Sequence, residues 1–434
     1  MLGKYVPFYT SSGMNSLSEA SSATISNIDT GKTTIDSPIE NAITMPRAIA
    51  VLTNCIVGLG LISVPYCFNC GIIITPILII SIGILTLFSL TILIDCAMKS
   101  SVFDYAKLIL VAFPKKTLDW LPNMLIIIAL SCASILYLHR ATSLIIACFE
   151  ELNNVPDFSS NRWFIVFVVE YPLLFGLTLF RTMNSLSFLS IISIFLILIY
   201  IFHSIYYFSK YTLIEGFNPD KKMVYFSTDI SIIIKSLSIL GSTFVCHPTL
   251  FPTIVKLKKP TMRRLKGTMF FVILVSILLF LIGGIFPYLT LFDDIQDTVV
   301  LRYYYKHHIL TIITKITYSI MLIITVPIRL FACRLSIEKM MINEESNHMI
   351  WDLIGIALIT LISIIVSFMK TLTVVDSIAG GIVGPTCVFI LPSIYYLMIC
   401  KDGSRTKHLL CWASLLVGAI FIVSSLYYSI AQLI

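Results

Sequence analysis

The sequence predicts an all-α membrane protein with eleven transmembrane helices. Of its 434 residues, 57% are hydrophobic and only 12% are charged, and the mean hydropathy of +0.94 lies far above that of soluble domains. Apolar runs of about 20 residues recur along the chain, and each is long enough to cross a hydrocarbon core ~30 Å thick. The runs are continuous rather than alternating, which is typical of helices and excludes a transmembrane β-barrel.

Hydropathy and helix-breaking residues place the spans along the chain. They are expected near residues 46–68, 72–97, 122–148, 162–180, 185–209, 229–255, 268–291, 308–333, 350–369, 374–400 and 409–433.

The distribution of basic residues predicts the orientation. With the N-terminus in the cytoplasm, nineteen Lys and Arg residues fall in cytoplasmic segments and seven in segments outside. This excess is what the positive-inside rule requires. An odd number of spans then places the C-terminus on the opposite side of the membrane. That side is the cell exterior if the protein lies in the plasma membrane, and the lumen if it lies in a vacuolar or lysosomal membrane. Topology also explains the net charge of +7, so no nucleic-acid partner is expected.

The first 43 residues differ in composition from the rest. They are polar, rich in Ser and Thr, and contain no apolar core followed by a cleavage site. We expect residues 1–43 to form a disordered cytoplasmic tail and residues 44–434 to form one transmembrane domain. The eleven cysteines are scattered through the spans, and the lone Cys67-Phe-Asn-Cys70 pattern has no second pair to complete a metal site. We expect these thiols to pack, and we expect no cofactor.

The first span is interrupted in its middle, over Asn54–Tyr66. Gly58 and Gly60 lower helix propensity, and Pro65 removes a backbone donor. Backbone that leaves the helix within a membrane must be surrounded by protein or must line a cavity. The sequence therefore predicts a discontinuous helix 1.

A second interruption occurs in the sixth span, over Gly241–Pro252. Here Ser242, Thr243 and His247 add polar groups at membrane depth. Spans 1 and 6 occupy equivalent positions in a five-plus-five inverted repeat with an eleventh helix left over. A pair of broken helices at matching positions marks the substrate site of a secondary transporter.

Five segments resemble the sodium-coupled neutral amino acid transporters, a family of the amino acid/auxin permease superfamily. They occur in the family's order over residues 45–400, although the second proline of the segment-8 pattern is absent. These segments are Asn54 with Val57-Gly58 and Pro65-Tyr66, Phe244-Val-Cys-His-Pro248 with the basic loop through Arg263-Arg264, Phe286-Pro-Tyr-Leu-Thr-Leu291, Thr325-Val-Pro327 followed by Arg329, and Phe389-Ile-Leu-Pro-Ser393.

The resemblance implies a LeuT-like fold and a secondary active transporter rather than an enzyme. Its substrates are expected to be amino acids, neutral ones, moved together with Na⁺ or H⁺ by alternating access. The implied partners are the amino acid and the lipid bilayer, and the protein is expected to function as a monomer.

Two groups of residues are candidates for the substrate site. Backbone groups in broken helices can bind the carboxylate and the ammonium of an amino acid, helped by the dipoles of the half-helices. Glycine would allow the ligand to approach closely, although small residues in membrane helices also serve tight packing. The candidates are Val57, Gly58, Leu59 and Gly60 in span 1 and Ser242, Thr243 and Phe244 in span 6.

Asn54 and Thr325 are the candidates for a Na⁺ site. The resemblance places an Asn on helix 1 and a Thr on helix 8 at the family's sodium site, whereas a lone Asn or Thr in a membrane helix more often forms an interhelical hydrogen bond. His247 is a candidate modulatory residue, because an imidazole titrates near pH ~6.5. A structural role for His247 is an equal alternative.

Ionisable residues within spans are costly and are expected to pair. Arg140, Glu170, Lys235 and Lys315 lie at such positions. Glu170 could form a buried pair with Lys315 or Arg140, or the basic groups could snorkel to the membrane surface, and the sequence does not assign the partners. Two other functions are considered. One is an amino acid sensor on the same fold. The other is a membrane-embedded enzyme using His247, which lacks supporting catalytic groups at a telling spacing.

Overall fold

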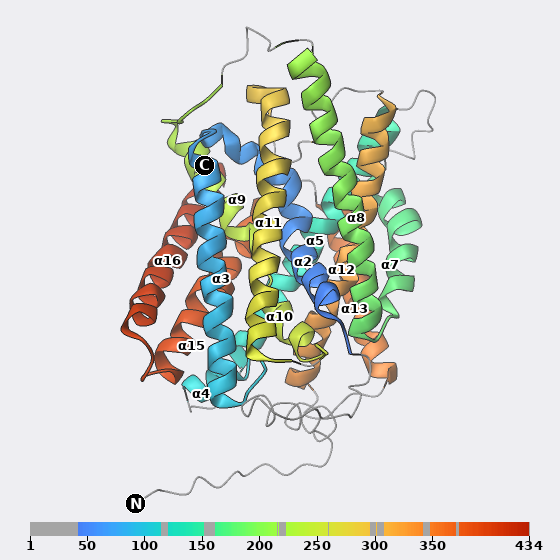
Figure 1. Ribbon diagram of the computed structural model, residues 1–434. Helices are drawn as coiled ribbons and strands as arrows, with labels where there is room; N and C mark the ends of the chain where they lie inside the picture. The colour runs from blue at the N-terminus through green and yellow to red at the C-terminus, as the bar shows by residue number, and fades with distance from the viewer. Residues whose placement is uncertain are drawn as a thin grey trace, which may run out of the picture.

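The structure, a computed structural model, is a bundle of long helices (Figure 1). It describes residues 42–113, 120–151, 161–214, 216, 223–258, 260–295, 301, 308–341, 348–369 and 373–433. The expected tail lies outside the described residues, apart from its last two positions. The all-α fold class is confirmed. The described backbone contains one isolated pairing, Ile43 with Leu257, and otherwise helices and their connections.

The helices follow the expected order of spans. The first half of the bundle comprises α2 (Met45–Cys67) with η1 (Phe68–Cys70), α3 (Ile74–Ser100), the short α4 (Leu108–Ala112), α5 (Trp120–Glu151), the consecutive segments α6 (Arg162–Phe164), η4 (Ile165–Glu170) and α7 (Tyr171–Thr178), and α8 (Met183–Tyr207) with η5 (Phe208–Ile214). The second half comprises α9 (Ile230–Thr243), α10 (His247–Ile254), α11 (Met262–Leu291) with η6 (Phe292–Asp294), α12 (Ile309–Met341), α13 (His348–Phe368), the consecutive segments α14 (Thr373–Asp376), η8 (Ser377–Val383), η9 (Thr386–Ile390) and α15 (Leu391–Ile399), and α16 (Arg405–Leu433).

Ten helices in the described part of the chain are long and apolar enough to cross a membrane. The remaining expected span, near 162–180, corresponds to the helical stretch Arg162–Thr178, which is only 17 residues long and contains a π-helical segment. The expected count of eleven is therefore not confirmed by length and composition.

The expected interruption of span 6 is confirmed, whereas that of span 1 is wrong. Helix α9 ends at Thr243 and α10 begins at His247, with Phe244–Cys246 between them. Helix α2, in contrast, is continuous from Met45 to Cys67 and carries Pro65 inside it. Glycine weakens a helix by only about 1 kcal/mol per residue, and the packing around α2 outweighs that loss.

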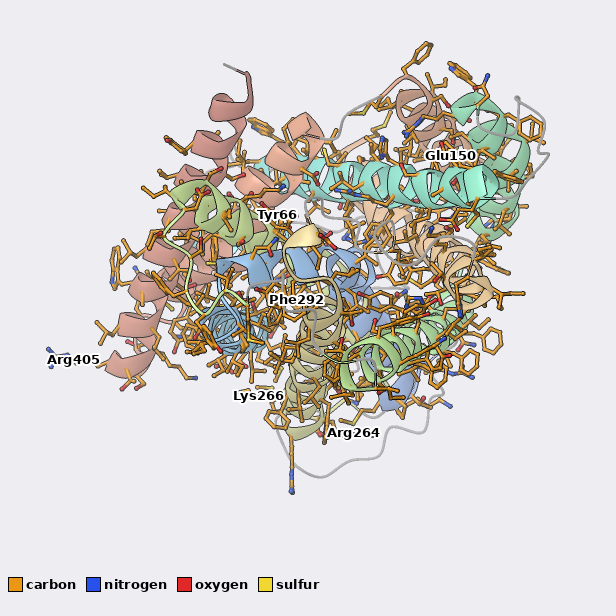
Figure 2. The ribbon with its side chains drawn as sticks, turned by 90° about the horizontal axis from the view of Figure 1, so that it is seen from above. Tyr66, Glu150, Arg264, Lys266, Phe292 and Arg405 are labelled. Atoms are coloured by element: carbon orange, nitrogen blue, oxygen red, sulfur yellow. The ribbon has the colours of Figure 1, made fainter. Side chains whose placement is uncertain are left out.

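Helix α2 lies in the middle of the bundle, with α15 and α16 on one side of it and α7 and α13 on the other (Figure 1). In its most apolar stretch 89% of the residues are buried, compared with 28% in α16. Figure 2 shows Tyr66, at the end of α2, close to the centre of the bundle and Arg405, the first residue of α16, at the rim. A helix that is apolar on all sides and also buried on all sides is a core helix.

Ion pairs join segments that the charge distribution assigns to one side of the membrane. Asp95 pairs with both Lys266 and Lys407, at 2.8 Å each, and Asp104 pairs with Lys339. Burial raises the pKa of the Asp104 carboxyl, but the Lys339 ammonium and the backbone N–H of Lys107 outweigh this effect, so the pKa lies below its ordinary value. These segments therefore share one end of the bundle.

Glycines bring α11 close to α2. A Cβ on Gly284 would lie 2.4 Å from Cε2 of Phe68, and a Cβ on Gly283 would lie 2.4 Å from Cδ1 of Leu61. Both distances are far below van der Waals contact. The neighbour of Gly283 is the end of a flexible leucine side chain, whereas Gly284 faces the Phe68 ring of η1 and Cγ1 of Val64 on α2, so the packing depends most strictly on glycine at Gly284.

We expect Gly284→Ala to destabilise the protein by about 1–3 kcal/mol, because the added methyl group overpacks the contact with Phe68. Gly176→Ala is the matched control, since a Cβ on that helical glycine would meet nothing within 4 Å. Thermal unfolding in detergent should show a lower midpoint for Gly284→Ala and no decrease for Gly176→Ala. Equal midpoints would contradict the packing argument.

Candidate substrate and ion site around helix α2

One step of helix α2 is bound by side chains from two other helices. In an α-helix the N–H of residue 59 faces the carbonyl of residue 55. Here the Leu59 N–H donates to the Tyr137 hydroxyl of α5 at 3.0 Å, and the Cys55 carbonyl accepts from Nη2 of Arg329 on α12 at 2.6 Å. Backbone N–H and C=O groups that a break was expected to free for other partners thus bind side chains although the helix is unbroken.

Two tyrosines enclose Gly58. The Tyr318 hydroxyl donates to the Gly58 carbonyl, and a Cβ on Gly58 would lie 2.5 Å from the Tyr137 oxygen. Both tyrosine side chains are fully buried. The absence of a side chain at Gly58 therefore allows the hydroxyl of Tyr137 to reach the helix backbone.

Gly60 is the point where α2 meets the broken sixth span. A Cβ on Gly60 would lie 2.9 Å from the methyl carbon of Thr243 and 3.0 Å from the ring of Phe280. The ring of Phe244 packs edge-on against Phe280, with centroids 5.2 Å apart. The structure thus brings the candidates Gly60, Thr243 and Phe244 together.

Ser242 and Val57 do not appear in the described contact between Gly60, Thr243 and Phe280. The Ser242 hydroxyl donates to the Ile239 carbonyl of its own helix, and its Cβ lies where a side chain on Gly380 would be, so it faces η8. Val57 is fully buried.

The structure also brings together the two candidate ion ligands. The Thr325 hydroxyl lies 3.2 Å from Oδ1 of Asn54 and 2.8 Å from the carbonyl of Met321. Both Asn54 and Thr325 are fully buried. The Asn54 Nδ2 has no hydrogen-bond partner among the described residues.

Arg329 lies one helical turn beyond Thr325 and was not among the predicted site residues. Its side chain is 5% exposed, its Nη2 also donates to the Tyr137 hydroxyl at 2.7 Å, and the guanidinium lies 4.4 Å from the centroid of the Tyr137 ring. In the described part of the chain no carboxylate pairs with it. The available signal was an arginine at the centre of an apolar span, which was treated only as part of a family pattern.

His247 occupies the first turn of α10 and is fully buried. Its Nε2 lies 3.1 Å from the Ser89 hydroxyl, which itself donates to the Val388 carbonyl. Since the serine proton is used there, Nε2 is assigned as the donor and Nδ1, which has no partner among the described residues, as the unprotonated nitrogen. The residue links α10 to α3 and η9, and its modulatory role stays a prediction.

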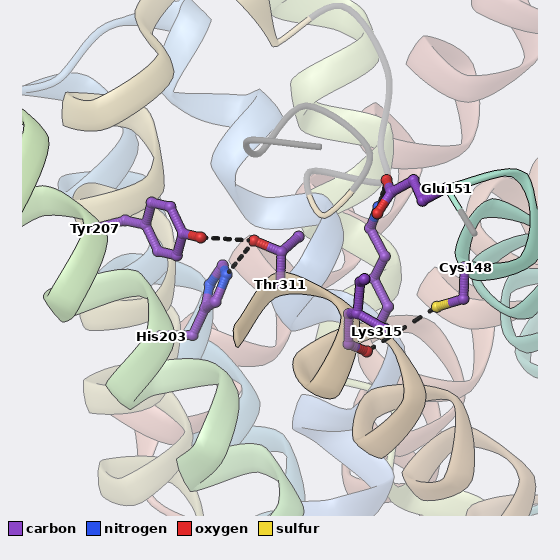
Figure 3. Close-up of polar contacts among 7 residues, drawn as sticks. Cys148, Glu151, His203, Tyr207, Thr311 and Lys315 are labelled. Atoms are coloured by element: carbon purple, nitrogen blue, oxygen red, sulfur yellow. Dashed lines mark hydrogen bonds and ion pairs between the residues drawn. The ribbon is translucent and has the colours of Figure 1, made fainter. Parts of the chain in front are cut away.

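Among the described residues, Glu170 forms neither of the two ion pairs considered for it. Lys315 pairs with Glu151, as Figure 3 shows, and Arg140 lies 3.6 Å from Asp376. Glu170 instead accepts from the Thr142 hydroxyl at 2.9 Å. The prediction ended span 3 at residue 148, whereas α5 continues to Glu151 and carries that carboxylate to the depth of Lys315.

Comparison with known proteins identifies the family. Residues 41–434 match the family model described as transmembrane amino acid transporter protein. The chain belongs to this family. It is 24% identical over 390 residues to the sodium-coupled neutral amino acid symporter 2 of Danio rerio, a match covering 81% of this chain and 75% of the relative. It is 26% identical over 196 residues to the sodium-coupled neutral amino acid transporter 4 of Pongo abelii, covering 44% and 36% of the two chains.

Solved structures share the fold at low sequence identity. MhsT in complex with L-phenylalanine superposes with a TM-score of 0.57 at 15% identity, covering 88% of this chain and 98% of that one. The manganese transporter of Eremococcus coleocola gives a TM-score of 0.58 at 13% identity, covering 94% and 90%. The chain is thus a multi-pass integral membrane protein with the inverted-repeat fold, in a family of transporters rather than enzymes, as the motifs indicated.

We expect Tyr137→Phe to destabilise the protein by about 1–3 kcal/mol, because it removes the acceptor of both the Leu59 N–H and the Arg329 guanidinium. Tyr395→Phe is the matched control, since this buried tyrosine has a hydroxyl without a partner among the described residues. Thermal unfolding in detergent should show a lower midpoint for Tyr137→Phe alone. A loss shared by both variants would indicate a general cost of removing buried hydroxyls.

Proposed function

We propose that this protein is a secondary active transporter of neutral amino acids, driven by Na⁺ or H⁺ through alternating access. The observation that carries the proposal is the contact at Gly60. There helix α2, whose backbone groups are hydrogen-bonded by side chains of neighbouring helices, meets the break between α9 and α10. The names of the two relatives support the substrate class, since both are neutral amino acid carriers.

The broken sixth span offers chemistry suited to an amino acid. The N-terminal end of α10 carries a partial positive charge that favours a carboxylate, and the C-terminal end of α9 carries a partial negative charge that favours an ammonium. Phe244–Cys246 lie between these two ends. We assign the amino acid backbone to Gly58, Gly60 and Thr243 with their neighbours Val57, Leu59, Ser242 and Phe244.

Alternating access gives the tyrosine and phenylalanine side chains a role. Tyr137 fills the space beside Gly58, and Phe280 fills the space beside Gly60. Entry of an amino acid to these glycines requires the two rings to move. The arrangement therefore corresponds to a closed site, in which α2 is covered from the sides of α5 and α11.

The proposed orientation has the N-terminus in the cytoplasm and the C-terminus outside or in a lumen, in the plasma membrane or the vacuolar or lysosomal membrane. The end of the bundle that carries Lys266, Lys339 and Lys407 then faces the cytoplasm. Neither relative is named as a sensor, so nothing in the comparisons favours that alternative.

The direct test is uptake of a panel of labelled amino acids into proteoliposomes that contain the purified protein. We expect saturable uptake of neutral amino acids that an inward salt or pH gradient accelerates, because a co-transported cation moves down its own electrochemical gradient. An inside-negative membrane potential should accelerate uptake further, since each cation gains ~2.3 kcal/mol per 100 mV. Protein-free liposomes are the control. Binding of an amino acid without any uptake would favour the sensor, and neither binding nor uptake would contradict both functions.

Phe244→Ala should shift selectivity towards larger amino acids, because it removes an aromatic ring beside the proposed site. We expect the ratio of uptake for large over small neutral side chains to rise roughly tenfold, the scale of discrimination in an apolar pocket. Phe188→Ala is the matched control, since this ring is 57% exposed on the outer face of α8. An unchanged ratio in competition assays would remove Phe244 from the site.

A further inference from the structure

We propose that Glu170 is a proton-binding site of this protein. Its carboxyl is neutral in the closed state of the bundle, and release of the proton in another state couples transport to H⁺. The presence of the proton is measurable without transport, whereas its coupling to transport rests on the proposed function.

Glu170 lies where the regular helical hydrogen bonding of the fourth span changes. It is the last residue of the π-helical segment η4, and Pro172 follows in the first turn of α7. Because proline has no backbone N–H, it cannot serve as a helical donor to the preceding turn. Short π-helical segments inside α-helices are frequent at functional sites. Here the segment ends on an acid within a span, which is costly unless the acid has a partner or a function.

The carboxyl of Glu170 is buried without a cation. The residue is fully buried, and its Oε1 has no hydrogen-bond partner among the described residues. Its Oε2 lies 2.9 Å from the Thr142 hydroxyl of α5, and no ion pair in the described part of the chain includes it. An ionised carboxylate would keep its charge in this interior beside one neutral partner. Because that costs far more than taking up a proton, the group is neutral.

The hydrogen bonds of Thr142 are completed by a proton on Glu170. The Thr142 hydroxyl has one proton and two oxygens within reach, the Leu138 carbonyl at 2.8 Å and Oε2 of Glu170 at 2.9 Å. If Glu170 is a carboxylate, it has to accept that proton, and only one of the two contacts is then a hydrogen bond. If Glu170 is protonated, Oε2–H donates to the threonine oxygen and the threonine proton goes to the Leu138 carbonyl. Both contacts are then hydrogen bonds.

The groups packed around η4 leave Glu170 in a neutral setting. The positive charge of Arg162 on α6 acts on Glu170 from a distance, but the guanidinium donates to the Met369 carbonyl and the Ser143 hydroxyl. The Tyr171 hydroxyl of α7 is hydrogen-bonded to α13. The other titratable or charged residues of the packed helices are His348 and Asp352 on α13 and Cys132, Tyr137, His139, Arg140, Cys148, Glu150 and Glu151 on α5. In the described structure none of these groups is hydrogen-bonded or ion-paired to Glu170.

A buried neutral acid couples the state that buries it to protons. In the closed state the carboxyl keeps its proton, whereas in a state that admits water to η4 it ionises as an exposed glutamate does. The two states then differ in proton affinity. By the reciprocity of linked equilibria, protons favour the closed state and closure takes up a proton.

Helix α5 connects this proton to the proposed substrate site. Thr142 lies on α5 five residues after Tyr137, whose hydroxyl binds the Leu59 N–H and whose side chain fills the space beside Gly58. Entry of an amino acid requires the Tyr137 ring to move. A movement of α5 that carries the ring away also changes the contact between Thr142 and Glu170, so opening of the site and loss of the proton belong to one transition.

The first measurement is an infrared difference spectrum between the wild type and Glu170→Gln, recorded on purified protein at neutral pH. A neutral carboxylic acid has a C=O stretching band that carboxylates and glutamine lack, so we expect this band in the difference spectrum. Glu150→Gln is the matched control, because it removes an exposed acid of α5 and should change only carboxylate bands. Carboxylate bands alone for Glu170→Gln would overturn the inference.

Thr142→Val tests the hydrogen bond of the proton, and it serves equally if Glu170→Gln does not fold. Without the hydroxyl the neutral acid loses its acceptor, so its C=O band should shift from the wild-type position. Thr178→Val is the control, since this buried hydroxyl of α7 has no partner among the described residues. A band that is absent from the wild type, or that Thr142→Val does not move, would contradict the assignment.

The second measurement is amino acid uptake into proteoliposomes with and without an inward pH gradient, at equal salt on both sides. One proton carried per amino acid allows a gradient of ~1 pH unit to raise accumulation up to about tenfold. We expect the wild type and Glu150→Gln to approach this gain. Glu170→Gln keeps the shape of the neutral acid but cannot release a proton, so its uptake should gain nothing from the gradient.

The two measurements separate the two proposals. A wild type that takes up no amino acid would contradict the proposed function and the coupling with it, while the infrared band would still decide whether Glu170 holds a proton. Wild-type uptake that does not respond to the pH gradient, or a gain that Glu170→Gln retains, would contradict the coupling alone.

Discussion

The arrangement of this bundle depends on how the polar backbone of one buried helix is satisfied. Helix α2 is surrounded by other helices, so its backbone cannot turn to water or to a membrane surface. At the Cys55–Leu59 step its carbonyl and N–H groups bind Arg329 from α12 and Tyr137 from α5. Because the same tyrosine also accepts from the same arginine, three helices are connected through one hydroxyl.

Glycines make this arrangement possible because they let neighbouring side chains approach the backbone closely, and not because they adopt unusual backbone conformations. None of the glycines discussed in α2 or α11 has a positive φ. Gly58 admits the Tyr137 hydroxyl, Gly60 admits Thr243 and Phe280, and Gly284 admits the ring of Phe68. The site is thus closed by contacts that a single methyl group would disturb. Conformational change in such a site must proceed by moving aromatic rings or whole helices, since the backbone of α2 is already regular.

The sequence predicted the candidate site in part. The family resemblance paired Asn54 with Thr325. The two spans predicted to be interrupted placed Gly60 near Thr243, because such spans meet at the centre of an inverted repeat. Sequence reasoning failed at Arg329, Tyr137 and Tyr318, since an aromatic or basic residue in an apolar span carries no sign of which neighbour it will meet. It left the partners of Glu170 open and missed Glu151 as the partner of Lys315, because the end of α5 was placed three residues too early.

By itself the sequence determined the environment, the order of the spans and the family, since hydropathy, charge distribution and short motifs are local properties of the chain. It also determined the break in the sixth span, where Pro248 follows a run of residues without strong helix preference. Only the tertiary structure decided that the first span is a continuous helix. The loss of helix stability caused by its glycines is small compared with the stabilisation from packing and hydrogen bonds with α5, α11 and α12. The tertiary structure also decided that Arg329 of α12 binds the Cys55 carbonyl of α2, which depends on the register of α12 against α2.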